Sequence, residues 1–418
     1  MTAAADAARL EAALRRQPAL ADWTARSRST ETAWRRVDGA GAEADGTLAR
    51  TDLAVEVHRD LPTGRGSAIA VITTDEPAVA LAQAARRAAA AVGPSWVSPA
   101  PAAPAEVDLT DPAILGAPLA EVADEVMARA RAAVGRRGGV GVDVAVSTTA
   151  TELFTRRGQR ARWQTTAVEV EFTVEDRGRR TTLRRRARQL SELDLPGALA
   201  GGLPDAAAVP LPAGTYPLVM TAAALLHDDR GLLEAFVGQA DPRLERQGLV
   251  RYRRGQLIAP GATLSLTSDG TLPFGWWSAP LGEHGEAVRR FPLVQAGVAA
   301  GLGLDPREAA LRGSSPNGDV RGLVVDLGAD QPDALIGPGV LVVERLAWLE
   351  VERTSGWFRA QLAAGTLHAA AGARPVTGGI VRGDAIAALA TARRSATAAA
   401  TPSYRGPSHW LLAALPVD

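Results

Sequence analysis

The segment 167–190 constrains the fold of this chain more than any other part of the sequence. Apolar residues at 168, 170, 172 and 174 alternate with polar ones, which predicts a half-buried β-strand. A two-residue loop at Arg177-Gly178 would return the chain as a β-hairpin in a fixed register. That register places four pairs of residues opposite each other: Glu169 and Arg186, Glu171 and Arg184, Glu175 and Arg180, and Phe172 and Leu183.

The same hairpin carries an arginine-rich run, 177–188, which by composition alone resembles a nucleic-acid-binding patch. Cross-strand pairing with glutamates accounts for three of these arginines, at a few tenths to about 1 kcal/mol for each pair. Aromatic residues that could stack on bases do not alternate with the arginines. The chain has 46 acidic and 46 basic residues, so its net charge attracts neither nucleic acid nor an anionic membrane. We therefore expect no nucleic-acid partner.

The remaining patterns predict an α+β protein, with an N-terminal α/β domain and a β-rich C-terminal domain. Helical spacing predicts helices over 77–92 and 119–133, and strict alternation predicts a strand over 140–146. The Gly-, Pro- and Ala-rich stretch 195–212 divides the chain into domains 1–205 and 206–418. In the second domain we expect helices only over 222–237 and 383–394, and strands at 216–219, 250–258, 262–266, 340–346 and 349–352.

Composition removes several kinds of chemistry. The chain has no cysteine, which excludes thiolate nucleophiles, cysteine metal ligands and disulfides. It also has no lysine, which excludes a Schiff-base lysine and a phosphate-loop lysine. The first ten residues lack the pattern of a signal peptide, and no apolar run reaches the roughly 20 residues of a bilayer span. These features predict a cytoplasmic protein without a membrane partner.

The segment 225–234 resembles a zinc-protease helix that retains only part of its chemistry. Such a helix needs two imidazoles on one face, with a carboxylate beside them that activates the metal-bound water. Here His227 is followed by Asp228, and Leu232 stands where the second imidazole is expected. Whether this chain is itself an enzyme depends on that leucine.

Four segments, in chain order, resemble the TldD/PmbA family of modulator proteases. They cover most of the chain after about residue 150, and the last of them, a Thr-Ser-Gly-Trp-Phe strand followed by Arg-Pro-Val and Gly-Gly, is the most specific. The segments are Glu152–Gly158; Leu225–His227 with Gly231; Asp269–Gly275 with Gly285; and Gly328–Ile336 continuing through Gly339–Val342, Thr354–Phe358, Gly365, Gly372–Val376 and Gly378-Gly379.

The resemblance implies two related subunits paired around an enclosed cavity. Active subunits of the family carry His-Glu-x-x-x-His and a late cysteine as zinc ligands. On this chain His227 keeps the first ligand, Asp228 replaces the glutamate, Leu232 replaces the second ligand, and the cysteine is missing. The chain therefore resembles the non-catalytic type, PmbA or TldE. The resemblance implies that this chain has no cofactor and that a TldD-like partner subunit holds the zinc. It also implies a peptide or small amide as the substrate. An antibiotic or other natural-product pathway is one setting that the resemblance suggests.

Two alternatives from other classes stay open. An autonomous metallohydrolase could use a rebuilt site of His227, Asp228 and His409, because His409 falls roughly where the family's cysteine would be. Alternatively, the chain could be a binding or scaffold protein without hydrolytic activity. His227 could also be a remnant of the family motif that only caps or packs at a helix start.

Four residues are candidates for the lining of a substrate cavity: Trp276, Trp277, His284 and His409. Adjacent tryptophans on a strand point to opposite sides, so one of the two would be buried and the other exposed. The exposed one would then line a cavity or a subunit interface, although plain core packing explains the pair as well. His284 lies in the turn Gly282–Gly285, which resembles an acidic turn of the family.

Overall fold

The computed structural model describes residues 3–72, 77–135, 137–176, 179–200, 207–227 and 229–418. The predicted hairpin is present: β6 (Arg160–Asp176) pairs with β7 (Arg179–Ala187) in the expected register, with Glu169 opposite Arg186 and Phe172 opposite Leu183. The predicted turn, 177–178, lies outside the described residues.

The ion pairs of this hairpin differ from the simple cross-strand prediction. Arg184 forms its ion pair with Glu169, its diagonal neighbour, and Arg186 forms one with Asp229, far along the chain. Diagonal pairs on a twisted sheet are within reach of long side chains. The register of the hairpin was therefore predictable from the sequence. The ion-pair partners of its arginines were not, because Arg186 pairs with a residue of the C-terminal half.

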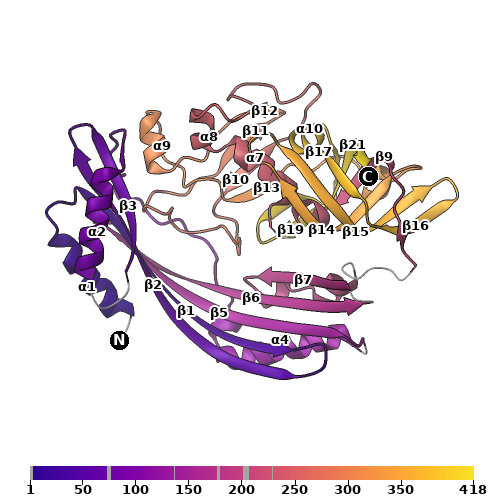
Figure 1. Cartoon of the computed structure of the whole chain (residues 1–418), viewed down its shortest axis with the longest axis horizontal. Coiled ribbons are helices and arrows are strands. Elements are labelled where there is room, and N and C mark those ends of the chain that lie inside the picture. Colours follow the sequence, from indigo (N-terminus) through magenta and orange to yellow (C-terminus); the bar gives the residue numbers. More distant parts are fainter. Residues whose placement is uncertain (1–2, 73–76, 136, 177–178, 201–206, 228) are drawn as a thin grey trace.

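The hairpin ends a seven-stranded antiparallel sheet in the order β4-β3-β2-β1-β5-β6-β7. Its long strands arch across the lower and left parts of Figure 1. The other strands are β1 (Asp22–Val37), β2 (Glu43–Leu61), β3 (Gly64–Ile72), β4 (Val92–Gly93) and β5 (Val140–Thr155). The predicted strand 140–146 is thus the first part of β5, and residues 94–106 form the predicted loop.

One face of this sheet is covered by helices. Apolar residues at alternate positions, such as Ala25 and Ala33 on β1 and Phe154 on β5, all lie on that face. They pack in two clusters, one with α1 and α2 and one with α4 and α5. The helices on this half of the chain are α1 (Ala3–Arg15), α2 (Pro77–Ala90), α3 (Pro112–Leu115), α4 (Leu119–Val134), η1 (Leu190–Glu192) and α5 (Leu195–Ala200).

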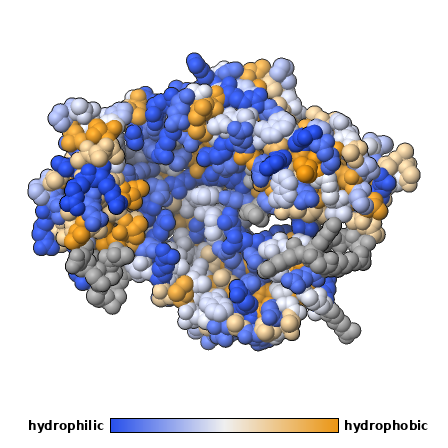
Figure 2. Space-filling view, in the orientation of Figure 1, coloured by the Kyte–Doolittle hydropathy of each residue, from blue (hydrophilic) through white to orange (hydrophobic). Residues whose placement is uncertain are grey.

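The opposite face of the sheet is polar and faces the C-terminal half of the chain (Figure 1). Thr24 and Arg26 on β1 and Glu56 on β2 alternate with the buried apolar residues and so lie on this face. Hydrophilic residues predominate where the two halves meet in the space-filling view (Figure 2). This polar face supplies most of one wall of the candidate site.

The C-terminal half contains a ring of strands. The order β14-β9-β21-β17-β15 is closed by the pairing of β14 with β15, and β16, β8 and β18 are attached to this ring. Its large apolar core contains the fully buried Trp410 and Phe358. The strands are β8 (Val209–Pro210), β9 (Gly214–Thr221), β14 (Leu341–Val351), β15 (Trp357–Ala369), β16 (Gly372–Thr377), β17 (Ile380–Asp384), β18 (Arg393–Arg394) and β21 (His409–Val417).

The C-terminal half also contains a second, six-stranded sheet. Its order is β12-β11-β10-β13-β20-β19. Its strands are β10 (Leu266–Asp269), β11 (Phe291–Gln295), β12 (Val298–Ala299), β13 (Gly322–Val325), β19 (Ala398–Thr401) and β20 (Tyr404–Pro407). The helical segments here are α6 (Ala222–Leu226), η2 (Gly231–Leu233), α7 (Glu234–Gln239), α8 (Pro242–Arg246), α9 (Pro306–Leu311), η3 (Pro332–Leu335) and α10 (Ala385–Ala390).

Several predicted elements of this half were wrong. The segment 250–258 forms no strand, and only Leu266 of 262–266 belongs to one. Ile258 and Leu264 are nevertheless buried, because they pack into the core from irregular backbone. The predicted strands 340–346 and 349–352 are a single strand, β14. The predicted helix 383–394 shrinks to α10, because residues 383 and 384 pair with β15 and Asp384 then caps the helix.

The α+β class is confirmed. The predicted boundary between 1–205 and 206–418 lies at residues 201–206, which are outside the described residues, and it stays a prediction. None of the helices in the described part of the chain has the length and apolarity to cross a bilayer.

Candidate functional site

The spacing of apolar residues had predicted one continuous helix for the degenerate zinc motif. The structure instead breaks the helix within the motif. α6 ends at Leu226, and His227 follows with a positive φ of 48°. Gly231, also at φ 48°, then starts η2; a Cβ at this position would lie 1.9 Å from the carbonyl oxygen of Leu225. The chain is therefore folded back tightly between α6 and α7, and a glycine is required at the bend. Asp228 lies outside the described residues.

The residues of this segment do not fit a zinc ion. Leu232, at the position of the second ligand, is fully buried in the apolar core of the C-terminal half. Within the described ranges no group of three or more His, Asp or Glu side chains could hold a metal. Zinc requires three or four ligands at defined distances.

His409, the other histidine of the possible rebuilt site, begins β21. Its Nδ1 lies 2.9 Å from the hydroxyl of Ser408, and its backbone N–H donates to the hydroxyl of Ser395. Burial lowers the pKa of His409. These contacts give it a structural environment on the sheet, away from the cavity described below.

Asp229, next to the degenerate motif, connects the two halves of the molecule. Its carboxylate accepts the indole N–H of Trp277 at 3.0 Å and the hydroxyl of Ser403, and it forms an ion pair of 3.1 Å with Arg186 of β7. Arg186 in turn lies over the ring of Trp276, 4.5 Å from its centre. We call these five residues the Asp229 cluster.

The two tryptophans differ in exposure: Trp277 is exposed and Trp276 is half-buried. Both lie in an irregular segment instead of a strand, and neither is fully buried. Trp277 is also covered by Arg230, 4.4 Å from the ring centre, while Arg188 donates to the backbone carbonyls of residues 275 and 276. Burial lowers the pKa of Arg188 to about 10. These cation–π and hydrogen-bond contacts hold the segment against β7.

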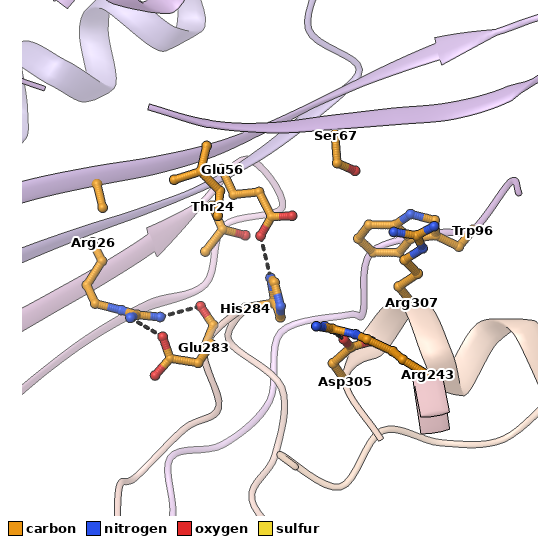
Figure 3. Close-up of a pocket in the computed structure, with 12 residues that line it drawn as sticks. Thr24, Arg26, Glu56, Ser67, Trp96, Arg243, Glu283, His284, Asp305 and Arg307 are labelled. Atoms are coloured by element: carbon orange, nitrogen blue, oxygen red, sulfur yellow. Dashed lines mark hydrogen bonds and ion pairs between the residues drawn. The ribbon is translucent and has the colours of Figure 1, made fainter. Parts of the chain in front are cut away.

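A cavity lies elsewhere, between the polar face of the N-terminal sheet and the loops and short helices of the C-terminal half (Figure 3). Its volume is about 320 Å³. We call it the interdomain cavity. Its lining residues come from three strands, the short helices α8 and α9, and several loops: Thr24, Arg26, Ala54, Glu56, Ser67, Ile69, Trp96, Arg243, Glu283, His284, Asp305 and Arg307. Of the four residues predicted to line a cavity, only His284 lies here.

His284 crosses from the C-terminal half to the sheet. Its Nδ1 lies 3.0 Å from a carboxylate oxygen of Glu56 on β2, and its backbone N–H donates to the buried Glu286. Burial by itself lowers the pKa of His284, but the contact with Glu56 outweighs burial and raises the pKa to about 9. His284 is therefore a cation at neutral pH.

Two further ion pairs line the interdomain cavity. Arg26 forms an ion pair with the carboxylate of Glu283, and it also donates to the Glu283 carbonyl oxygen at 2.7 Å. Arg243 on α8 donates to Asp305 at 2.8 Å. Asp305 also caps α9 by accepting the backbone N–H of residue 308. In both carboxylates burial alone would raise the pKa, and the net pKa is nevertheless lowered by the arginine and hydrogen-bond partners.

Sequence reasoning missed most of this cavity. Thr24 and Arg26, two residues apart on β1, and Glu56 on β2 carry the period of two that marks one face of a strand. The polar face that these two strands share was not recognised from the sequence. The arrangement is a set of fixed ion pairs around a polar recess, suited to binding a charged ligand.

The fold and the site define a class: an arched antiparallel sheet, a ring-closed β-structure behind it, and a metallopeptidase-like segment whose residues do not fit the metal. Residues 213–414 match the PmbA/TldA metallopeptidase C-terminal domain. The C-terminal half of the chain therefore carries a domain of the PmbA/TldA metallopeptidase type, in agreement with the resemblance of the sequence motifs. No curated protein is significantly similar in sequence.

Solved structures share the fold over nearly the whole chain. A crystal structure of a proposed modulator of DNA gyrase from Bacteroides thetaiotaomicron has a TM-score of 0.80 at 15% identity, covering 99% of this chain and 98% of that one. A similar proposed modulator from Thermotoga maritima gives 0.77 at 15% identity, with both chains covered completely. TldE from Thermococcus kodakarensis gives 0.76 at 16% identity, with 98% and 99% covered.

Proposed function

We propose that this chain is a non-catalytic subunit of a heterodimeric TldD/TldE-type zinc metalloprotease or amide hydrolase. A TldD-like paralogous subunit carries the zinc and hydrolyses the amide bond. This chain closes the shared cavity and influences which substrate enters. The observation that carries the proposal is Leu232, which is buried in the core where an active family member needs a metal-binding imidazole.

Three further observations support the same reading. The chain has no cysteine to act as a third ligand. The helix that would present the ligands is broken at His227. The carboxylate of Asp229, the one described acid next to the motif, is engaged with Trp277, Ser403 and Arg186. A carboxylate held in this way is a poor general base, because its lone pairs already accept hydrogen bonds.

The substrate is a peptide or a small amide conjugate. The identity to the three solved structures is only 15–16%, although the fold is shared over the full length. Such divergence on a shared fold supports a specialised member, and we propose a natural-product (antibiotic) pathway as its setting.

Native mass spectrometry with metal analysis tests the proposal, on this chain tagged and purified from its own host. We expect a complex of two different subunits with one zinc, and no zinc when this chain is expressed alone. A homodimer with stoichiometric zinc, or peptide hydrolysis by this chain alone, would overturn it. A stable homodimer with neither zinc nor activity would point to a scaffold protein instead.

A further inference from the structure

The interdomain cavity has an excess of positive charge. Each of its three carboxylates, Glu56, Glu283 and Asp305, is paired with a cation of the same cavity. Arg307, on α9, is an additional cation, and no hydrogen bond or ion pair joins it to another described residue. The cavity therefore contains one positive charge that the described chain does not neutralise.

Arg307 has no partner among the described residues, and part of its guanidinium is enclosed. Its Nε is buried without a hydrogen bond, a costly state for a guanidinium N–H. Its Nη2 lies close to Gly93, where an added Cβ would be only 2.6 Å away. The absence of a side chain at Gly93 thus leaves room for the guanidinium beside the cavity. A charged side chain in a cavity wall, with a buried N–H that has no partner among the described residues, is a candidate ligand contact.

The wall near Arg307 also has an apolar part. Trp96, almost fully buried, and Ile69, strongly exposed on β3, both line the cavity, together with Ala54 on β2 (Figure 3). Small-molecule sites typically combine such apolar surface with a few fixed polar groups, in volumes from about 300 Å³ upward. A guanidinium matches the two oxygens of a carboxylate in a bidentate arrangement.

We propose that the interdomain cavity binds a small organic carboxylate, such as the C-terminal end of a short peptide. Its carboxylate pairs with Arg307, and its apolar part lies against Ile69 and Trp96. This inference goes beyond the proposed function, because it assigns a ligand class to a site that His227, Leu232 and the Asp229 cluster do not line. It needs no partner subunit, and its failure would leave the heterodimer proposal untouched.

Isothermal titration calorimetry on the full chain tests the inference, with N-acetyl-L-leucine as the probe. N-acetyl-L-leucinamide is the matched control, since it differs only in lacking the charge. We expect the acid to bind and the amide to bind at least about tenfold more weakly, because a charge-assisted hydrogen bond is lost. Inorganic phosphate, which lacks an apolar part, should also bind more weakly than the acid.

Variants locate the site. Arg307→Gln should weaken binding of the acid at least about tenfold, whereas Arg253→Gln, at an exposed arginine outside the cavity, should not. Ile69→Glu, at an exposed position, adds a repelling carboxylate and should also weaken binding, which keeps the test valid should Arg307→Gln fail to fold. No binding of the acid, equal binding of the amide or of phosphate, or unchanged binding by both cavity variants would overturn the proposal.

Discussion

Glu56 on β2 and His284 in the loop before β11 form an ion pair across the interface of the two halves, with Oε2 3.0 Å from Nδ1. The two residues are far apart in the sequence, and each raises or lowers the pKa of the other: Glu56 keeps His284 protonated, and His284 outweighs the effect of burial to lower the pKa of Glu56. The pair links the polar face of the sheet to the C-terminal half.

Because of this pair, the free energy of unfolding should decrease as the pH becomes alkaline. The pKa of His284 rises from an ordinary 6.5 to about 9 on folding, so its contribution is complete below about pH 6.5 and is lost as the pH rises through about 9. We expect the free energy of unfolding to fall by about 1–2 kcal/mol from this residue between pH 7 and 9.5. Urea unfolding at both pH values measures the change.

His284→Gln should remove that part of the pH dependence. His368→Gln, a histidine on β15 away from the cavity, is the control and should leave the dependence unchanged. An equal pH dependence in the His284 variant and the unaltered chain would contradict the assignment.

Leu232→His should not create a zinc site. The residue is fully buried in the core, so an imidazole there loses apolar packing and lacks the geometry of a metal ligand. We expect no zinc in elemental analysis and a loss of about 2–4 kcal/mol in the free energy of unfolding. Leu232→Met, which preserves volume and apolarity, should cost less than about 1.5 kcal/mol. Stoichiometric zinc in the histidine variant would show that the segment still forms a site.

Asp229→Ala should weaken the contact between the N-terminal sheet and the C-terminal half. The change leaves Arg186 without its ion pair and the indole N–H of Trp277 without its acceptor. We expect a loss of about 1–3 kcal/mol in the free energy of unfolding. Tryptophan fluorescence can monitor the unfolding, because Trp276 and Trp277 lie in the cluster. Glu125→Ala, at an exposed position on α4, should change little. Equal stability of both variants would mean that the cluster contributes nothing.

Gly231→Ala should lower the free energy of unfolding by more than the cost of placing alanine at a positive φ. A Cβ there would lie 1.9 Å from the Leu225 carbonyl oxygen, so the backbone must shift. Gly248 also has a positive φ, of 73°, but a Cβ there meets nothing within 4 Å. We therefore expect Gly248→Ala to cost about 1 kcal/mol and Gly231→Ala clearly more, about 2 kcal/mol or above, in urea unfolding. Similar losses would indicate that the backbone at 231 relaxes freely.

Local patterns predicted the N-terminal half well and the C-terminal half only in part. The alternation around Phe172 fixed both the strand and its register, because a shift by one residue would expose every apolar side chain. The segment 222–237 looked like one helix because its apolar residues recur at helical spacing. The structure has no such continuous helix, because the chain bends at His227. Leu226 on α6 and Leu232 on η2 then pack into the same core from two separate short helices.

The candidate site depended on tertiary structure almost entirely. The turn carrying His284 was singled out by its residues, but its partner Glu56 was not, because nothing local connects two residues on separate domains. The aromatic pair Trp276-Trp277 was recognised as unusual, yet its partners Arg186 and Asp229 become neighbours only when the halves dock.

The sequence by itself determined the family resemblance, the α+β class, the hairpin register and the incomplete set of zinc ligands. These follow from residue identity and from periodicities of two and about four, which act over a few neighbouring residues. The tertiary structure alone decided that Leu232 lies in the core, that Asp229 joins the two halves, and that Arg307 lies beside a cavity with no partner among the described residues. Those properties arise because burial and charge pairing depend on which distant segments meet.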